Sequence, residues 1–177
     1  MIAMFAISSL VGCLLRPIDV PDRLRAWEPT VRWEACHQGI SPKLVLSVMD
    51  VESAGKWNAK NAAATGLMQI KLATARVLGY RGSRWALMNP GINIHYGVAY
   101  LSRLMKRYTY GWDAISAYNC GRPHWSKGRG FMCLGHKTTY VKQVAYRFRH
   151  FGAKHKPSGR ILVKLAYYKP FSGIVPQ

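Results

Sequence analysis

The sequence is poor in acidic residues. It has 7 Asp+Glu against 26 Lys+Arg among 177 residues, which gives a formal net charge of +19. No acid follows Asp113, so the twelve Lys or Arg between residues 122 and 169 have no acid near them in sequence. Such a field favours an anionic partner, which is nucleic acid, an anionic membrane face or an acidic cell-wall polymer. Charge alone does not choose among these three.

A long apolar run is also absent. Residues 1–11 are apolar but too short to cross a bilayer, and they resemble the tail of a secretory signal. The run Leu10-Val11-Gly12-Cys13 resembles a bacterial lipobox, in which Cys13 would be lipidated after cleavage. No Lys or Arg precedes the run, as a signal usually requires. These features predict export; the alternative is a buried N-terminal helix of a cytoplasmic or virion protein.

Cysteines are too few for a dense disulfide framework. If Cys13 is lipidated or removed, the natural candidate pair among the other three, Cys36, Cys120 and Cys133, is Cys120–Cys133. The alternative is reduced, packed thiols. Internal repeats and low-complexity segments are absent too. A chain of this length with 49% hydrophobic residues therefore suits one compact domain with short extensions.

Helical patterns account for most of the chain. Ser41-Pro42 predicts a helix start, and Ser53-Ala54-Gly55 predicts its end. An amphipathic segment over residues 22–38 is interrupted or restarted at Pro29. Apolar spacing predicts further helices near 70–78, 89–108, 112–118 and 138–151, with loops over 56–66 and 120–135. Asp113 would lie in the first turn of its helix, where the dipole favours an acid. The sequence therefore predicts a mainly α fold.

Glu52 lies on the apolar stripe of the helix that begins at Pro42. Burial and the partial negative charge of the helix C-terminus should both raise its pKa. A carboxylic acid that is protonated near neutral pH is what a general acid requires. The alternative is a structural Glu bonded to backbone or to an Arg. Asp50 points about 200° away around the helix, so a mechanism with one carboxylate fits better than the carboxylate pair of glycoside hydrolases.

Several short motifs follow Glu52 in a fixed order. They are Glu52-Ser53, Gly66-Leu67-Met68-Gln69, Asn93-Ile94, Tyr100-Leu101, Ala117-Tyr118-Asn119 and Tyr140-Val141. In order and spacing they resemble the motif series of the soluble lytic transglycosylase (SLT) family of peptidoglycan-cleaving enzymes, over about residues 38–150. The resemblance implies a lysozyme-like, mainly helical single domain over 22–152, with long loops and a cleft for the glycan strand. Residues 1–21 would be a signal or lipobox segment, and 153–177 a basic C-terminal extension.

The family cleaves the bond between N-acetylmuramic acid and N-acetylglucosamine without using water. Carried over, Glu52 would protonate the glycosidic oxygen and then, as a carboxylate, take the proton of the muramoyl 6-hydroxyl. That attack closes a 1,6-anhydro ring and requires no second carboxylate. An intramolecular hydroxyl also spares the enzyme the positioning of a water.

The resemblance also implies substrate-binding residues. Ser53 would hydrogen-bond near the acid or to the substrate, and Tyr140 would place its hydroxyl near Glu52. Tyr118 and Asn119 would bind the N-acetyl groups. The cleft wall would be formed by Gly66, Leu67, Met68 and Gln69, with Met68 and Gln69 contacting sugar or stem peptide. The structural alternatives are core filling for Met68, a helix-end Tyr118 capped by Asn119, and a half-buried Tyr140 on an amphipathic helix.

Other interpretations stay open. The spacing of Cys120, His124, Cys133 and His136 could bind zinc, but the central interval is short, and we predict no metal and no cofactor. The alternative functions are a nucleic-acid- or cell-wall-binding module without catalysis and a water-using muramidase (lysozyme), for which a bacteriophage origin is one option. Nucleic acid is the less favoured partner because no recognised binding motif accompanies the basic tail.

The expected partner is the peptidoglycan glycan strand. The basic C-terminal part would contact anionic wall polymers or a membrane surface, and the chain would act as a monomer. The expected location is the periplasm or cell envelope, with a lipid anchor on Cys13. The alternative is a bacteriophage virion or lysis enzyme.

Overall fold

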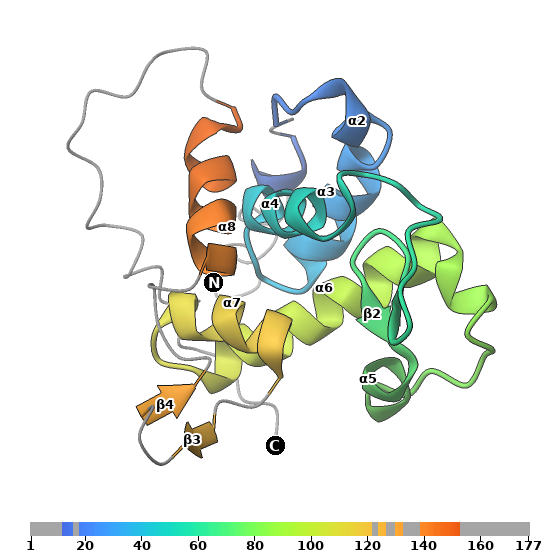
Figure 1. Cartoon of the computed structure of the whole chain (residues 1–177). Helices are drawn as coiled ribbons and strands as arrows, with labels where there is room; N and C mark the ends of the chain where they lie inside the picture. The colour runs from blue at the N-terminus through green and yellow to red at the C-terminus, as the bar shows by residue number, and fades with distance from the viewer. Residues whose placement is uncertain (1–11, 16–17, 122–123, 127–129, 133–138, 153–177) are drawn as a thin grey trace, which may run out of the picture.

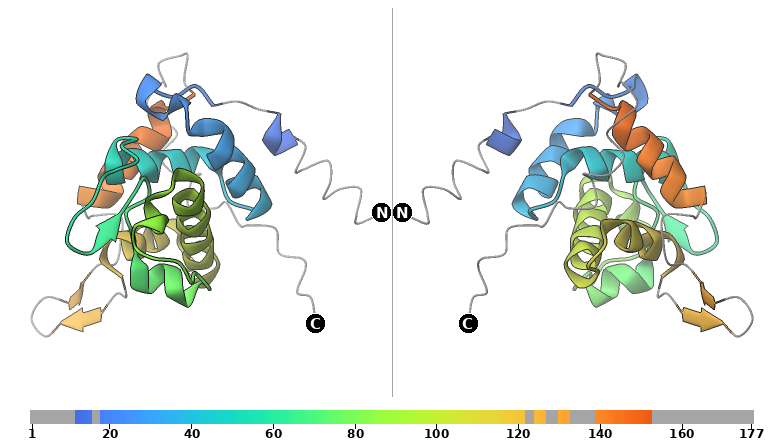
Figure 2. Two further views of the ribbon diagram at one scale, coloured as in Figure 1. Left: turned by 90° about the vertical axis from the view of Figure 1, so that its right-hand side faces the viewer. Right: turned by 90° about the vertical axis from the view of Figure 1, so that its left-hand side faces the viewer.

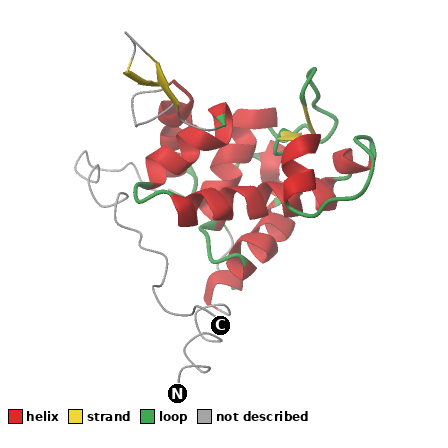
Figure 3. Cartoon of the chain, turned by 90° about the horizontal axis from the view of Figure 1, so that it is seen from below, coloured by secondary structure: helices red, strands yellow, loops and turns green. Residues whose placement is uncertain are grey.

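The computed structural model describes residues 12–15, 18–121, 124–126, 130–132 and 139–152, and most of them are helical (Figures 1 and 3). This confirms the predicted mainly α fold. The helices are α2 (Asp22–Arg25), α3 (Glu28–His37), α4 (Pro42–Ser53), α5 (Leu72–Val77), the 3-10 helix η1 (Ala86–Met88), α6 (Pro90–Arg107), α7 (Gly111–Cys120) and α8 (Thr139–His150).

Helix caps explain where the two central helices begin. The Ser41 hydroxyl accepts a hydrogen bond from the Leu44 amide over 3.4 Å, and the Asn89 side chain accepts one from the Ile92 amide over 3.3 Å. A proline follows each cap and suits the first helical position. α4 ends at Ser53, and the residue that caps it, Ala54, is left-handed with φ 52°. The predicted starts of both helices are confirmed, whereas the break expected at Pro29 lies slightly earlier, between α2 and α3.

Two short hairpins correct the predicted loops. β1 (Ala64–Thr65) pairs antiparallel with β2 (Ile70–Lys71), with Thr65 opposite Ile70. The helix expected from residue 70 therefore begins only at Leu72. β3 (His124–Ser126) pairs antiparallel with β4 (Gly130–Met132) inside the segment expected to be loop. Figure 2 shows both hairpins on one side of the helical body.

α4 is the central helix of the core. α3 and α8 pack on it, and the long helix α6 packs against α3 and α7 (Figure 1). Most residues of α4 are buried, as in a helix enclosed by others. The fully buried side chains at these contacts include Val45, Leu46, Val48, Met49, Ile94, Val98, Leu101 and Val144. The packing places the last turn of α4, which carries Glu52, beside the first turn of α8.

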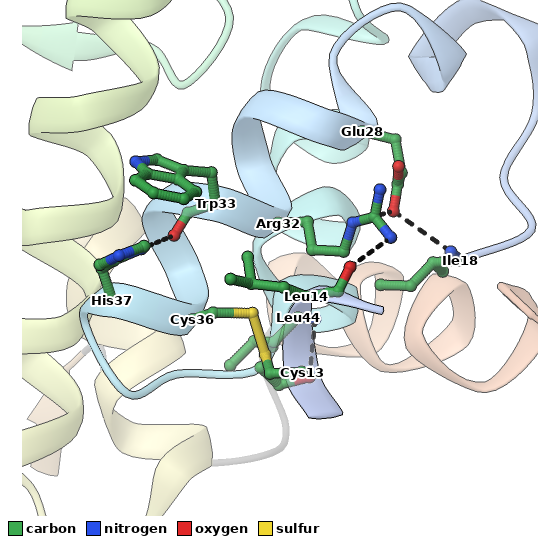
Figure 4. Close-up of a disulfide and its surroundings, with 10 residues drawn as sticks. Cys13, Leu14, Ile18, Glu28, Arg32, Trp33, Cys36, His37 and Leu44 are labelled. Carbon is green, nitrogen blue, oxygen red and sulfur yellow. Dashed lines mark hydrogen bonds and ion pairs between the residues drawn. A yellow bond between two sulfur atoms is a disulfide. The ribbon is translucent and has the colours of Figure 1, made fainter. Parts of the chain in front are cut away.

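A disulfide between Cys13 and Cys36 joins the N-terminal segment to α3 (Figure 4). Their Cα atoms lie 6.0 Å apart, within the ordinary range. This bond and the lipid modification predicted for Cys13 exclude each other because both use the same sulfur atom, so the lipidation prediction is corrected. The sequence alone did not indicate Cys36 as the partner of Cys13, because the two cysteines are 23 residues apart and meet only in the folded chain. The predicted partner of Cys120, Cys133, lies outside the described residues.

Polar contacts add to the disulfide. The Arg32 guanidinium donates to the Leu14 carbonyl over 2.8 Å and pairs with Glu28 at 3.3 Å (Figure 4). Glu28 in turn accepts from the Ile18 amide over 3.2 Å. At the other end, the Gly152 amide after α8 donates to the Asp19 carbonyl over 2.7 Å. Residues 12–15 and 18–20, here called the N-terminal strap, therefore run from α3 to the end of α8.

Reduction of this disulfide should lower stability. In the chain-entropy model, opening a loop of 23 residues lowers the free energy of unfolding by about 3 kcal/mol. For a chain of this size that corresponds to a fall in Tm of about 6–12 °C. Thermal unfolding with and without dithiothreitol measures the effect. The matched control is the Cys13→Ala/Cys36→Ala variant, which should unfold at the lower temperature in either buffer. An unchanged Tm in that variant without reductant would contradict the prediction.

None of the helices within the described ranges combines the length and apolar composition that a bilayer-crossing helix needs. The predicted signal run over residues 1–11 and the basic extension over 153–177 lie outside those ranges. Their roles stay predictions.

Candidate active site

Glu52 lies at the C-terminal end of α4 and lines a cleft. The cleft is bordered by the β1–β2 hairpin on one side and by α6 and α7 on the other. The Tyr140 hydroxyl, from the first turn of α8, donates a hydrogen bond to Glu52 Oε1 over 2.6 Å. The proximity expected from the family resemblance is therefore present. Oε1 is engaged by this bond, and Oε2 has no bond to Tyr140.

Burial raises the pKa of Glu52 to about 7, and the hydrogen bond from Tyr140 opposes this rise. The direction agrees with the prediction from the sequence. Tyr140 is mostly buried, and burial together with the Glu52 charge raises the pKa of its phenol well above the usual range. The phenol therefore stays protonated and acts as a donor throughout the pH range in which Glu52 titrates.

Asp50 lies on the other side of α4 and takes no part in the cleft. Its carboxylate is paired with Arg23 at 2.7 Å and with Arg147 at 2.6 Å. Burial favours the neutral form, but the bonds and charges of the two guanidiniums outweigh it, so the pKa of Asp50 is lowered. Glu52 is thus the one acid among the cleft-lining residues, as the expectation of a single carboxylate requires.

Asn93 of α6 shapes the turn between β1 and β2. Its side-chain oxygen accepts from the Met68 amide over 2.7 Å, and its nitrogen donates to the carbonyls of Thr65 and Leu87, each over 2.9 Å. Gly66, with φ 78°, packs directly on this amide, and a Cβ at Gly66 would lie 2.3 Å from the Asn93 nitrogen. Both motifs from the sequence, Gly66 and Asn93, therefore belong to one buried network that fixes the cleft wall.

Gln69 closes the same turn at the cleft surface. Its nitrogen donates to the carbonyls of Ala59 and Gly66 over 3.0 and 2.8 Å, and its oxygen accepts from Asn61 over 3.2 Å. Its backbone is left-handed, with φ 46°. Gln69 lines the cleft as predicted, but its polar groups also brace the loop.

Several predicted substrate contacts are not supported by the geometry. The side chains of Leu67 and Met68 are fully buried, and Met68 packs beneath Gly97, so neither can touch a bound sugar. Met68 fills the core, which was the structural alternative. Ser53 is buried, donates to the Met49 carbonyl over 3.3 Å and accepts from the Gly55 amide over 3.2 Å, so it ends the helix instead of facing substrate.

Tyr118 and Asn119 lie at the end of α7 and both line the cleft. The Tyr118 hydroxyl donates to the Met68 carbonyl over 2.8 Å, so its proton is already used, and its binding of an N-acetyl group stays a prediction. Its ring remains part of the wall, 5.2 Å from that of Tyr100. Asn119 is exposed and can reach a ligand.

Several residues that line the cleft were not predicted as site residues. They are Asn61, Ala64, Ile70, Lys71, Thr74, Tyr100 and Gly121. Tyr100 carried a signal, since Tyr100-Leu101 was one of the motifs that matched in order. Asn61 and Lys71 carried none, because the hairpin that brings them to the cleft was not predicted.

No group of three or more metal-ligating side chains gathers within the part of the chain that the structure describes. Of the zinc spacing considered above, Cys133 and His136 lie outside that part. The arrangement that remains is a partly buried carboxyl group whose pKa is about 7. A phenol fixes it by a hydrogen bond, and it lines a polar cleft. It suits proton transfer to and from a bound oxygen.

Comparison with known proteins places Glu52 and the other cleft-lining residues within a known domain. A family model described as "Transglycosylase SLT domain" matches residues 29–130. Membrane-bound lytic murein transglycosylase C of Actinobacillus pleuropneumoniae is 38% identical over 115 residues, which is 56% of this chain and 32% of the relative. Endo-type membrane-bound lytic murein transglycosylase A of Cronobacter sakazakii is 36% identical over 118 residues, 57% of this chain and 58% of the relative.

A solved structure also matches. It is the X-ray structure of an inactive mutant of lytic transglycosylase Slt from Pseudomonas aeruginosa, with 32% identity and a TM-score of 0.48. The match covers 55% of this chain and 16% of that one. Among the curated relatives, this chain matches about a third of the length of transglycosylase C and 58% of the length of transglycosylase A.

Proposed function

Since the chain belongs to the transglycosylase SLT domain family, we propose that it is a lytic transglycosylase of peptidoglycan. It cleaves the bond between N-acetylmuramic acid and N-acetylglucosamine and leaves a 1,6-anhydro end on the muramic acid. The observation that supports this best is the single carboxyl group of the cleft, Glu52, with a pKa of about 7 and a hydrogen bond from Tyr140.

The proposed reaction uses Glu52 twice. The protonated Oε2 donates to the glycosidic oxygen as the bond to the muramic acid C1 breaks. The resulting carboxylate then takes the proton of the muramoyl 6-hydroxyl while that oxygen attacks C1, so Glu52 ends protonated, as it began. A group that must be acid and then base works best with a pKa near the working pH, which burial supplies here.

The Tyr140 hydroxyl keeps Glu52 in position through both steps. The bond engages Oε1 and leaves Oε2 as the oxygen for proton transfer to and from the substrate. It also stabilises the carboxylate formed after the first proton transfer, because a hydrogen bond to the charged form favours that form. Asn119 and Gln69 lie on the walls where they can orient the sugars.

Product analysis tests the proposal. Purified peptidoglycan sacculi are incubated with the chain, and the released muropeptides are separated and weighed by mass spectrometry. We expect 1,6-anhydro products, each lighter by one water than the reducing-end product of hydrolysis. Reducing-end products alone would instead identify a water-using muramidase. No release together with retention of sacculi or DNA would identify a binding module.

The pH dependence should follow Glu52. Since the acid form starts the reaction, kcat/KM should fall about tenfold per pH unit above about pH 7. Tyr140→Phe removes the bond that lowers the pKa, so the alkaline limb should move to higher pH while kcat falls. Initial rates of release from sacculi between pH 5 and 9 measure both effects. An alkaline limb near pH 4–5 would exclude Glu52 as the acid, and a limb that does not move in Tyr140→Phe would contradict the effect of the Tyr140 bond on its pKa.

We also propose that the chain acts at the cell envelope. The two relatives are named membrane-bound murein transglycosylases, and they are bacterial proteins that lend no support to a bacteriophage origin. The Cys13–Cys36 disulfide fits an oxidising compartment. Contact of the basic C-terminal extension with anionic wall polymers, and action as a monomer, remain part of the proposal. Fractionation of cells followed by detection of the chain tests the location.

A further inference from the structure

Asp50 is the centre of a buried ion cluster that the proposed reaction does not use. Arg23 grips it with two parallel bonds, Nε to Oδ1 over 2.7 Å and Nη2 to Oδ2 over 2.9 Å. Arg147 donates from Nε to Oδ2 over 2.6 Å. The Asp50 side chain is only 1% exposed, against 49% for Arg23 and 28% for Arg147. Charge-assisted bonds of this kind have narrow geometry, so they fix the groups that make them.

The cluster joins three helices. Asp50 belongs to α4, Arg23 to α2 and Arg147 to α8. Residues two apart point about 200° from each other around a helix, so Asp50 and Glu52 lie on opposite sides of α4. α8 touches both sides, through Arg147 at Asp50 and through Tyr140 at Glu52.

The spacing on α8 matches this double contact. Tyr140 and Arg147 are seven residues apart, which is about two turns and about 10 Å along one face of the helix. Between them Val141 and Val144 pack into the core. Apolar contacts are not directional and allow α8 to slide or rotate slightly. The directional contacts at the two ends remove that freedom.

We propose that Asp50 with Arg23 and Arg147 is a positioning clamp, which holds α8 in the register that brings the Tyr140 hydroxyl onto Glu52. The inference rests on the proposed function, since it assigns Glu52 and Tyr140 to the reaction. Asp50 and its two arginines are positioning residues and do not touch the substrate. The clamp explains why an acid-poor chain keeps a second carboxylate two residues from the first.

Other ionisable groups contact Glu52 or line its cleft and must be held constant in a test. They are Tyr140 from α8, Tyr118 from α7, Tyr100 from α6 and Lys71 from β2, of which the last three share its cleft. Only Tyr140 reaches Glu52 by way of α8. A loss of the clamp should therefore act on Glu52 as the loss of the Tyr140 hydroxyl does.

A double-mutant series tests the clamp. Arg147→Met, Tyr140→Phe and the double variant are compared with the wild type by the pH profile of kcat/KM on sacculi. We expect Arg147→Met to lose roughly 10-fold in kcat/KM at pH 6, the order of effect that a small misplacement produces. Its alkaline limb should move up in pH as in Tyr140→Phe. The double variant should show no further shift, because both changes remove one bond.

Controls separate position from stability. Arg25→Met removes the exposed Arg25–Asp22 pair, at 2.9 Å, and should leave the profile unchanged. If Arg147→Met does not fold, Arg147→Lys keeps a charge at Asp50 and should show a smaller shift of the same sign, again absent in the Tyr140→Phe background. A lower Tm with an unmoved alkaline limb, or shifts that add in the double variant, overturns the clamp. Either result leaves the proposed function standing, which fails instead if Glu52→Gln stays active.

Discussion

Glu52→Gln should fold as the wild type does and lose roughly 10⁴-fold in release of anhydro-muropeptides, the upper end of the range for a single general acid–base group. Glutamine keeps the shape of the protonated carboxyl group, and its oxygen can still accept from the Tyr140 hydroxyl. It cannot release or take up the proton that both proposed steps require. Activity within about tenfold of the wild type would contradict the assignment of Glu52.

The same variant should also be more stable at high pH. Burial raises the folded-state pKa of Glu52 from 4.5 to about 7, so the unfolded state releases this proton first as pH rises. The contribution of Glu52 to stability is fully present below about pH 4.5 and is lost as pH rises through about 7. Above pH 7 the wild type should therefore be weaker than Glu52→Gln by up to about 3 kcal/mol.

Urea unfolding of both proteins at pH 5 and pH 8 measures this difference. The gap should be larger at pH 8 than at pH 5, because above its folded-state pKa the wild type holds a buried charge that glutamine does not carry. A gap that does not change with pH would mean that Glu52 is not desolvated. The prediction places a stability cost at the acid that the proposed reaction needs, a trade that active sites often show.

Gly66→Ala should be the most damaging single-methyl change in the cleft wall. At φ 78° an alanine is strained, and its Cβ would lie 2.3 Å from the Asn93 side-chain nitrogen. Asn93 would have to give up bonds to Thr65, Leu87 or Met68 that no water can replace in a fully buried site. We expect a loss of about 4 kcal/mol in the free energy of unfolding from strain plus broken bonds.

Gly91→Ala is the matched control. Gly91 lies in the first turn of α6, where a Cβ would meet only the Asn89 side-chain oxygen at an ordinary 3.5 Å. Alanine there should change stability by less than about 1 kcal/mol, in the stabilising direction. Urea unfolding compares the two variants. Equal effects of the two changes would mean that the Asn93 network does not set the conformation of the wall.

Local signals in the sequence predicted most helices well. Ser41-Pro42 and Asn89-Pro90 placed the starts of α4 and α6 because a cap and a proline act within one turn. Asp113 lies in the first turn of α7, as predicted. The opposite directions of Asp50 and Glu52 follow from helix geometry alone. In each case the information lies within a few residues of the feature.

Features that depend on distant partners were not predictable in this way. The hairpins have strands of two or three residues, too short for an alternating pattern. The Cys13–Cys36 bond needs the path of the strap across α3. The burial of Met68 depends on Gly97 and Tyr118, which lie far from the motif GLMQ in sequence. The burial of Ser53 depends on how α4 ends at Gly55. The family resemblance indicated the correct segments of the chain. Only the fold separates the residues that line the cleft from those that are buried behind its wall.

The disulfide between Cys13 and Cys36 also makes the stability of the chain depend on the redox conditions of the cell compartment that contains it. The reducing cytosol in which the chain is made keeps such thiols reduced. A loss of about 3 kcal/mol in the free energy of unfolding then means a roughly hundred-fold larger unfolded fraction. Proteases act on that fraction. On the proposed function, an enzyme that cuts the wall would reach its full lifetime only in the oxidising space that holds the wall. Chain left behind would be removed faster.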